Sequence, residues 1–224
     1  MAGIPGAPAK PRTPLSREQV LRAAITLADG SGLEALSMRK LGRVLGVEAM
    51  SLYNHVAGKD DLLDGMANLI WSEITLPSPR GDWRAAIRKT AISVYRTLLR
   101  HPWVPGLSIA SGRVHEARLR YIDAILGRLR KAGLSDALTY HAYHVIDSHI
   151  VGFSMWVSGH TMSAGRRDEQ ATAALLRDLS EELPYLAEHG QQHRNGGGLK
   201  GTDEFILVLD FILDGLDRLR ADSA

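Results

Sequence analysis

Apolar residues recur at helical spacing along most of this chain, and no segment alternates apolar with polar residues as a half-buried strand does. The first helix is predicted to begin after Ser16, because Gln19 stands three residues later and completes the pattern of a capping box. It is predicted to end at the glycine-rich residues 30–32. Its apolar stripe consists of Val20, Ala24, Ile25, Leu27 and Ala28.

Two further helices are predicted around a tight turn. Ser37 is suited to cap the second helix, and Gly46 is predicted to end it, since glycine readily adopts the positive φ of a helix C-terminus. The third helix, over residues 48–54, is too short and too polar to be a core element. A supporting helix, a turn and a short outward-facing helix are the parts of a helix-turn-helix. The inward side chains of this unit are predicted to be Leu41, Leu45, Val47 and Leu52.

Helical patterns continue to the end of the chain. A fourth helix is predicted over residues 59–75, and a linker with Pro and Gly follows at residues 76–82. The remaining helices are predicted over residues 83–100, 114–131, 135–158, 171–183 and 203–220. The segments predicted to be non-helical are a broken turn at 106–112, a polar stretch at 158–170, a short turn from Pro184 and a loop at 190–201. The predicted fold class is therefore all-α.

Composition narrows the class of protein. The 224 residues include no Cys, which excludes disulfides, thiolate catalysis and Cys-based metal sites and favours a cytoplasmic location. Neither a secretory signal nor an apolar run long enough for a membrane span is present. Positive charge is concentrated at the front, where residues 1–59 hold eight Lys or Arg against four acids. This end is the one suited to a polyanion such as DNA.

An enzyme is not expected. The chain has no Gly-x-Ser-x-Gly motif, and the glycines at 196–198 have neither the preceding strand nor the Gly-Lys-Ser/Thr sequence of a phosphate loop.

The residue types around the third helix suit contacts with duplex DNA. Ala49 and Ser51 are small enough to let the helix enter the major groove, and Met50 can contact a thymine methyl group. Arg39, in the first turn of the preceding helix, can reach a guanine edge or a phosphate. The side chains suited to phosphate contacts are Tyr53, His55 and Lys59.

The segment SMRKLGRVLGVEAMSLYNHVAGKDDLL, residues 37–63, closely resembles the DNA-binding domain of the TetR family of bacterial repressors. The shared features are L-G-V, a short helix with L-Y-x-H, and a Lys that starts the next helix. The resemblance is strong over residues 16–75 and extends more weakly over the rest, which is similar to the tetracycline-repressor type in helix order and in its closing apolar segment. It implies DNA contacts by Ser37, Met38, Arg39, Ala49, Met50, Ser51, Tyr53, Asn54, His55 and Lys59.

The operator sequence does not carry over, because Asn54 stands where tetracycline repressors have Trp, and Ala49 and Met50 also differ from them. The domain organisation implied is a disordered basic arm at residues 1–15, a DNA-binding domain at 16–59, a connecting helix at 60–76 and a dimerisation and effector-binding domain at 82–221. The expected protein is a repressor that binds a palindromic operator as a homodimer and is released by a small-molecule effector. A dimeric DNA-binding regulator without an effector stays open as an alternative.

The last predicted helix supports dimerisation without the resemblance. It is apolar over most of its circumference from Phe205 to Leu216, so a second face of the helix must also be buried. Pairing with the 135–158 helix and with the symmetry mates of both helices would bury that face, although burial within one subunit is the alternative. A twofold dimer would present two recognition helices about one turn of DNA (~34 Å) apart. Leu209→Asp is then expected to give monomers.

The effector site is predicted from aromatic and polar residues in the C-terminal half. The residues proposed to line it are Trp71, Tyr95, Trp103, Tyr121, His144, Asp147, Met155 and Trp156, with His141, His149 and Met162 also considered. For the aromatics, a core-filling role is the alternative; for His144 and Asp147, it is a buried hydrogen-bonded pair. Aligned with tetracycline repressors, the chain has Ser108 at the magnesium-chelating position and Thr90 where an Asn contacts the drug, which favours another effector.

No metal or cofactor is expected. His141, His144 and Asp147 share one helical face, but His149 falls away from it, and no Glu-x-x-His pair completes a di-iron bundle. A metal-responsive regulator remains the less favoured interpretation.

Overall fold

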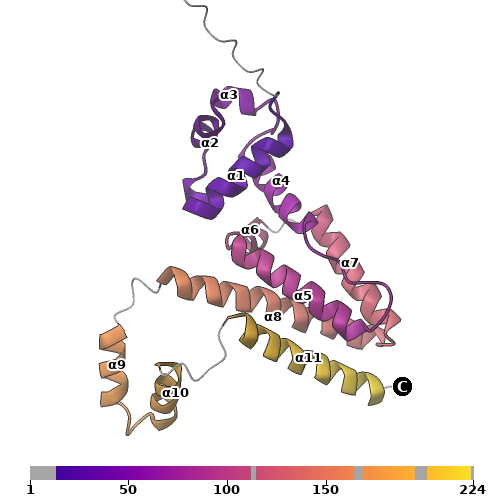
Figure 1. Ribbon diagram of the computed structural model, residues 1–224, viewed down its shortest axis with the longest axis vertical. Coiled ribbons are helices and arrows are strands. Elements are labelled where there is room, and N and C mark those ends of the chain that lie inside the picture. Colours follow the sequence, from indigo (N-terminus) through magenta and orange to yellow (C-terminus); the bar gives the residue numbers. More distant parts are fainter. Residues whose placement is uncertain (1–13, 112–114, 164–168, 195–200, 223–224) are drawn as a thin grey trace, which may run out of the picture. The chain divides into compact units, whose positions relative to one another are not determined.

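The computed structural model describes residues 14–111, 115–163, 169–194 and 201–222, and its regular elements in these ranges are all helical, which confirms the all-α prediction. Most of the predicted arm at residues 1–15 lies outside the described residues. The elements are α1 (Arg17–Ser31), the 3-10 helix η1 (Leu33–Ala35), α2 (Met38–Leu45), α3 (Ala49–Leu52), α4 (Lys59–Ser72), α5 (Trp83–Arg100), α6 (Val104–Ser111), α7 (Glu116–Lys131), α8 (Asp136–Ser163), α9 (Glu169–Asp178), α10 (Pro184–Arg194) and α11 (Thr202–Asp222) (Figure 1).

The chain divides into two compact units. The boundary between them along the chain lies inside α4, where unit 1 ends at Met66 and unit 2 begins at Ala67. Within the described ranges, no helix combines the length and the apolar content that a membrane crossing requires.

The start of α1 has the predicted capping box. The Ser16 Oγ accepts a hydrogen bond from the Gln19 backbone N–H at 3.2 Å, and the Gln19 Oε1 accepts one from the Ser16 N–H at 2.8 Å. Two backbone donors that have no partner within the helix are satisfied in this way. The buried face of α1 is formed by Val20, Leu21, Ala24, Ile25 and Ala28.

The ends of α2 also follow the prediction. Ser37 caps the helix by accepting from the Lys40 N–H at 3.2 Å, and Gly46 follows it in the left-handed conformation, with φ 66° and ψ 34°. A second glycine, Gly42, permits the close approach of the turn. A Cβ at this position would lie 2.8 Å from the Val47 carbonyl oxygen and 3.2 Å from the Ala49 nitrogen.

An ion pair joins the first and last helical segments of unit 1. Arg17 reaches Asp61 with both terminal nitrogens, at 2.8 Å and 2.6 Å, and it also donates to the His55 carbonyl at 2.8 Å. The Ala57 N–H donates to the same carboxylate at 2.8 Å. The hydrogen bond from Arg17, followed by that from Ala57, lowers the pKa of Asp61 from 3.8 to about 2.

This carboxylate predicts an acid-sensitive contribution to stability. Because its pKa is lower in the folded chain than in the unfolded one, its contribution is complete above about pH 4 and is lost as the pH falls through 3.8 towards 2. Asp61→Asn is expected to lower the free energy of unfolding by about 1 kcal/mol at pH 7, a value reduced for a side chain about one-third exposed. Urea unfolding of both proteins from pH 7 to pH 2 should show the difference shrinking towards zero. A constant difference would contradict this role, and Asp123→Asn, at an exposed position on α7, is the control.

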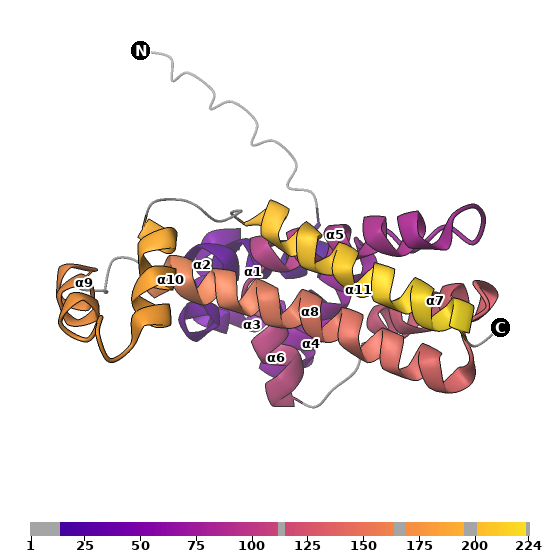
Figure 2. The same cartoon turned by 90° about the horizontal axis from the view of Figure 1, so that it is seen from below.

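Unit 2 is built around α5 and α8. The helix α5 packs against α7, α8 and α11, and α8 packs against α7 and α11 (Figure 1). The views agree that α8 and α11 run side by side (Figure 2). The largest of its fully buried side chains are Tyr95, Tyr121 and Phe205. Tyr95 stacks on Phe205 with ring centroids 4.0 Å apart, which joins α5 to α11.

Ion pairs reinforce the contact between α5 and α11. Arg88 binds Asp210 at 2.8 Å, and Arg84 binds Asp214 one turn away on each helix. Asp210 and Asp214 of the last helix are therefore partners of α5.

Several predicted boundaries in the C-terminal half are wrong. The segment predicted as a broken turn at 106–112 contains α6, because Pro105 stands in the first turn, where a proline removes no helical hydrogen bond. Similarly, Pro184 opens α10, which replaces the predicted short turn and occupies the first part of the predicted loop at 190–201. The helix α8 continues to Ser163, five residues beyond the predicted end, and α9 ends at Asp178 before the predicted 183. An exposed glycine such as Gly159 costs a helix only about 1 kcal/mol, so it did not stop α8.

Candidate nucleic-acid interface and buried polar cluster

The predicted helix-turn-helix is formed by α2, the turn at Gly46 and α3. Leu41 and Leu52 are fully buried and anchor the two helices, as predicted, whereas Leu45 and Val47 are only half-buried. The helix α3 is shorter than the predicted 48–54. Tyr53, Asn54 and His55 lie in the turns that follow it, where the Tyr53 N–H donates to the Met50 carbonyl at 3.2 Å and the His55 N–H to that of Leu52 at 2.9 Å.

The side chains predicted to contact DNA are accessible from solvent. Met50 is 74% exposed and Tyr53 46% exposed, unusual values for large apolar side chains in a small helical unit. Ser37, Arg39, Asn54 and Lys59 are also exposed, and the half-buried members of the set are Met38, Ala49, Ser51 and His55. Met50 and Tyr53 therefore present to solvent a surface that the core of unit 1 does not use.

The positive charge of unit 1 is concentrated on α2. Arg39, Lys40 and Arg43 stand on this helix without an acidic neighbour. None of the three forms an ion pair within the part of the chain that the structure describes. Acids follow soon after, at Asp60, Asp61 and Asp64, but Asp61 is held by Arg17. A cationic α2 next to an exposed α3 is electrostatically suited to a phosphate backbone.

Unit 2 contains a buried polar cluster, formed by Trp71 at the end of α4, Arg118 and Tyr121 of α7, and Tyr143 and Asp147 of α8. The rings of Trp71 and Tyr121 lie 5.4 Å apart, and the Arg118 guanidinium lies 5.2 Å from the centre of the Trp71 ring. Arg118 also pairs with Asp147 at 3.5 Å. This cluster brings together three of the residues predicted to bind an effector: Trp71, Tyr121 and Asp147.

The hydrogen-bonding capacity of the cluster is not satisfied by the described residues. Trp71 Nε1, Arg118 Nε, the Tyr121 hydroxyl and one Asp147 oxygen are all buried and have no hydrogen-bond partner among those residues. Burial raises the pKa of Asp147 despite the opposing charge of Arg118, and burial raises that of Tyr121 well above its ordinary range. Buried polar groups without partners are costly, so they are usually satisfied by a water molecule or a ligand. Arg118 and Tyr143 were not predicted as site residues, because the sequence does not show that these polar side chains are turned inward.

Other predicted effector residues lie elsewhere. Tyr95 and Trp103 are buried in unit 2, but His144, Met155 and Trp156 are exposed on α8 and do not join the cluster. The predicted alternative of a buried pair between His144 and Asp147 is wrong, because His144 is exposed with its Nδ1 at 2.8 Å from the Tyr140 carbonyl, while Asp147 pairs with Arg118.

The histidines of α8 have separate surroundings. His149 lies against Phe205, with its Nε2 at 3.0 Å from the Phe205 carbonyl, whereas His141 is exposed. In the described residues, no three His, Cys, Asp or Glu side chains are grouped closely enough to hold a metal ion. Thr90 is buried, with no hydrogen-bond partner for its hydroxyl among the described residues; the side chains of Ser108 and Met162 are outside them.

The helices α8 and α11 carry apolar side chains that their own subunit leaves exposed. Phe205, Leu209, Leu213 and Leu216 form the buried face of α11. On its opposite side, Phe211 is 63% exposed. The other large apolar side chains exposed on the two helices are Leu207, Leu219, Tyr140, Val145, Met155 and Trp156. Large apolar side chains left exposed on two adjacent helices are typical of a protein–protein interface.

Comparison with known proteins agrees with this arrangement. Residues 76–220 match the family model of the tetracyclin repressor-like C-terminal domain. The repressor DrrR1 of Streptomyces coeruleorubidus is 34% identical over 218 residues, which cover 94% of this chain and 80% of that protein. The class D tetracycline repressor of Escherichia coli is 39% identical over 183 residues, which cover 80% of this chain and 83% of that protein.

A solved structure is also similar over most of its length. The TetR family protein ActR of Streptomyces coelicolor, in complex with (S)-DNPA, superposes with a TM-score of 0.69 at 25% sequence identity, covering 91% of this chain and 98% of that chain. The helix-turn-helix geometry, the match of the C-terminal domain and these relatives lead to one conclusion. This chain belongs to the TetR family of transcriptional regulators.

Proposed function

We propose that this chain is a transcriptional repressor that binds a palindromic DNA operator as a homodimer and is released from it by a small-molecule effector. The observation that carries the proposal is the exposed surface of α3 beside the cationic α2. Leu41 and Leu52 hold the two helices together from inside, and the side chains left outside are of the types that contact bases and phosphates.

The exposed apolar surface of α8 and α11 supports the homodimer. A twofold interface brings the same patch of both subunits together, so a surface centred on Phe211 would be covered by its own copy. Two subunits then offer two helix-turn-helix units to the two halves of a palindrome.

The buried polar cluster supports a ligand-responsive protein. Its unpaired donors and acceptors could be satisfied by a ligand with carbonyl and hydroxyl groups, and the rings of Trp71 and Tyr121 offer an aromatic surface beside them. The relative ActR has been solved with a bound small molecule. Residue Trp71 lies on α4, the helix that begins at Lys59 of the DNA-binding segment. A ligand that repositions Trp71 would therefore act on the helix that leads to that segment, and it need favour one conformation by only about 1–3 kcal/mol.

Operator binding tests the DNA-contact assignment. The operator is first selected from random duplexes with the purified protein, and affinities are then measured by fluorescence anisotropy at fixed salt. Arg39→Ala is expected to weaken binding by about tenfold or more, since a direct contact to a base edge contributes about 1–3 kcal/mol. Arg22→Ala is the matched control, because Arg22 lies on α1 and pairs with Glu18. Equal affinities of the Arg39 variant and the wild type would contradict the assignment.

The role of the buried cluster predicts two effects of opposite sign. Tyr121→Phe removes a buried hydroxyl that lacks a partner among the described residues, so the ligand-free protein is expected to be as stable as the wild type or about 1 kcal/mol more stable. A compound found by thermal stabilisation of the wild type should stabilise this variant less and release it from the operator less readily. A loss of stability without ligand would instead indicate a structural role for the hydroxyl. If no compound of a broad aromatic library stabilises the wild type, an effector-free regulator is favoured.

A further inference from the structure

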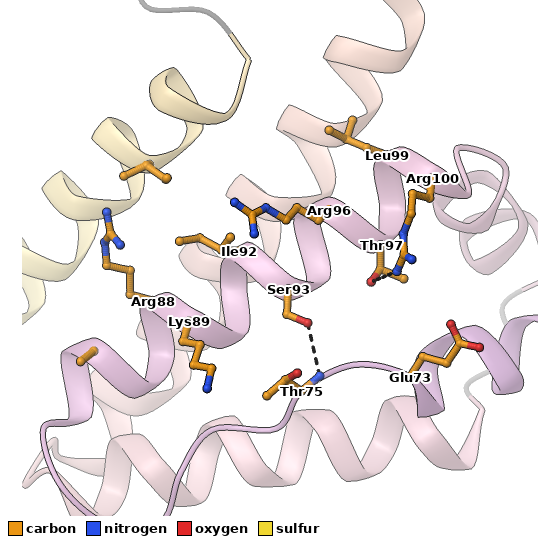
Figure 3. Close-up of a pocket in the computed structure, with 12 residues that line it drawn as sticks. Glu73, Thr75, Arg88, Lys89, Ile92, Ser93, Arg96, Thr97, Leu99 and Arg100 are labelled. Carbon is orange, nitrogen blue, oxygen red and sulfur yellow. Dashed lines mark hydrogen bonds between the residues drawn. The ribbon is translucent and has the colours of Figure 1, made fainter.

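A groove of about 1000 Å³ runs along the outer side of α5 in unit 2 (Figure 3). One side of it faces α11, where Arg88, Ile92 and Arg96 follow one another along α5. The other side faces the segment that carries Glu73 and Thr75, opposite Lys89, Ser93 and Thr97. None of the residues of the buried polar cluster lines this groove.

The groove is strongly cationic. Arg88, Lys89, Arg96 and Arg100 line it, against the single carboxylate of Glu73. Arg88 is engaged by Asp210, and Arg100 donates to the Thr97 hydroxyl at 3.3 Å. Lys89 and Arg96 are exposed and form no ion pair with the described residues. Two cationic groups are therefore available to an anion in this groove, and Arg100 adds to the same field.

The cationic side chains of α5 that line the groove also repel one another. Arg96 and Arg100 stand four residues apart on α5, a spacing at which like charges destabilise a helix. An anion bound beside Arg96 would reduce that repulsion.

Apolar side chains form a floor on the side of the groove that faces α11. Ile92 and Leu99 of α5 and Ile206 of α11 lie among the lining residues, and each is partly exposed to the groove. The wall towards Thr75 is fixed by a hydrogen bond, in which the Thr75 N–H donates to the Ser93 hydroxyl at 3.3 Å. The cationic residues extend from Arg88 to Arg100 of α5, about 18 Å along the helix axis. The groove thus combines length, an apolar floor and positive charge at its margins.

We propose that this groove binds an amphipathic anion, a molecule with a carboxylate or phosphate head and an extended apolar body. Arg96 would bind the head, Lys89 would add positive charge from the other side of the groove, and the apolar body would lie on Ile92 and Ile206. The site is distinct from the buried polar cluster and does not depend on the operator or on the effector proposed above. A neutral apolar molecule would lack the contacts with the cations, and an inorganic anion would leave the floor uncovered.

The test uses the full-length protein and three probes: dodecanoate below its micelle concentration, dodecanol and inorganic phosphate. Binding is measured by isothermal titration calorimetry at low and high salt. The wild type should bind dodecanoate at least tenfold more tightly than dodecanol or phosphate, with an affinity that falls as salt rises. The double variant Lys89→Gln with Arg96→Gln should lose at least tenfold in affinity for dodecanoate. The double variant Lys131→Gln with Arg218→Gln, which removes the same charge at exposed positions outside the groove, should retain it.

A separate variant locates the bound molecule. Tyr121→Phe should leave dodecanoate binding unchanged, because Tyr121 belongs to the buried cluster. Weaker binding by Tyr121→Phe, together with unchanged binding by the Lys89 and Arg96 variant, would place the anion in the cluster and overturn the proposal. Equal affinities for dodecanoate and dodecanol, or binding of phosphate alone, would overturn it as well.

Discussion

Replacing Phe211 with aspartate is expected to convert the proposed dimer into folded monomers and to lower the operator affinity by about 100-fold or more. Phe211 is 63% exposed on α11, so its own subunit loses little when it is replaced. In the proposed dimer, the same position is buried against apolar side chains of the partner, where an unpaired carboxylate is strongly unfavourable. A monomer offers one helix-turn-helix to one half of the palindrome, and the loss of the second half costs about 3 kcal/mol or more for a 100-fold effect.

Sedimentation velocity measures the first effect, and anisotropy with the selected operator measures the second. Leu76→Asp is the matched control, because Leu76 is 45% exposed and lies outside α8 and α11. A dimeric Phe211→Asp variant with full operator affinity would exclude this surface as the interface. The variant suggested by the sequence, Leu209→Asp, is unsuitable for this test, since Leu209 is fully buried in its own subunit and the substitution would unfold it.

Gly42→Ala is expected to weaken operator binding at least tenfold and to destabilise unit 1. The added Cβ would stand 2.8 Å from the Val47 carbonyl oxygen and 3.2 Å from the Ala49 nitrogen, which are backbone atoms and cannot turn away. The turn must shift to accommodate it, and α3, which begins at Ala49, would move with the turn. Overpacking of this kind typically costs about 1–3 kcal/mol.

The matched control is Gly30→Ala, near the end of α1, where a Cβ would meet no atom within 4 Å. This change is expected to raise the free energy of unfolding by about 0.5–1 kcal/mol, because alanine is the better helix former, and to leave operator affinity unchanged. Urea unfolding and anisotropy on both variants measure the contrast. If Gly42→Ala bound the operator as tightly as Gly30→Ala, the close turn would have no part in positioning α3.

Features set by neighbouring residues could be predicted from the sequence. The Ser16–Gln19 capping box, the Ser37 cap and the left-handed Gly46 all formed as expected, because each is a hydrogen bond or a backbone preference within a few positions. The bounds of α5 matched the prediction for a similar reason: Asp82 caps its first turn by accepting from the Arg84 and Ala85 N–H groups. By contrast, the turns predicted at 106–112 and from Pro184 are helices, because the structure uses Pro105 and Pro184 in first turns.

The two candidate sites also differ in how far they could be predicted from the sequence. The exposed face of α3 was predictable, since a short polar helix beside buried leucines leaves few other orientations. The buried cluster was predicted only in part. Trp71, Tyr121 and Asp147 were proposed, but Arg118, which contacts Trp71 and Asp147, was not. His144, Met155 and Trp156 were proposed with them and lie at the surface of α8.

By itself, the sequence determined the helical class, the helix-turn-helix and the two apolar faces of the last helix, because periodicity and capping act over one or two turns of chain. Only the tertiary structure decided which polar side chains of α7 and α8 are enclosed, which face of α11 remains exposed, and that the cations of α5 line a groove. Those outcomes depend on how helices far apart in the sequence rotate and pack against one another. A helix with apolar residues on two sides can bury either one, and the choice is made by its neighbours.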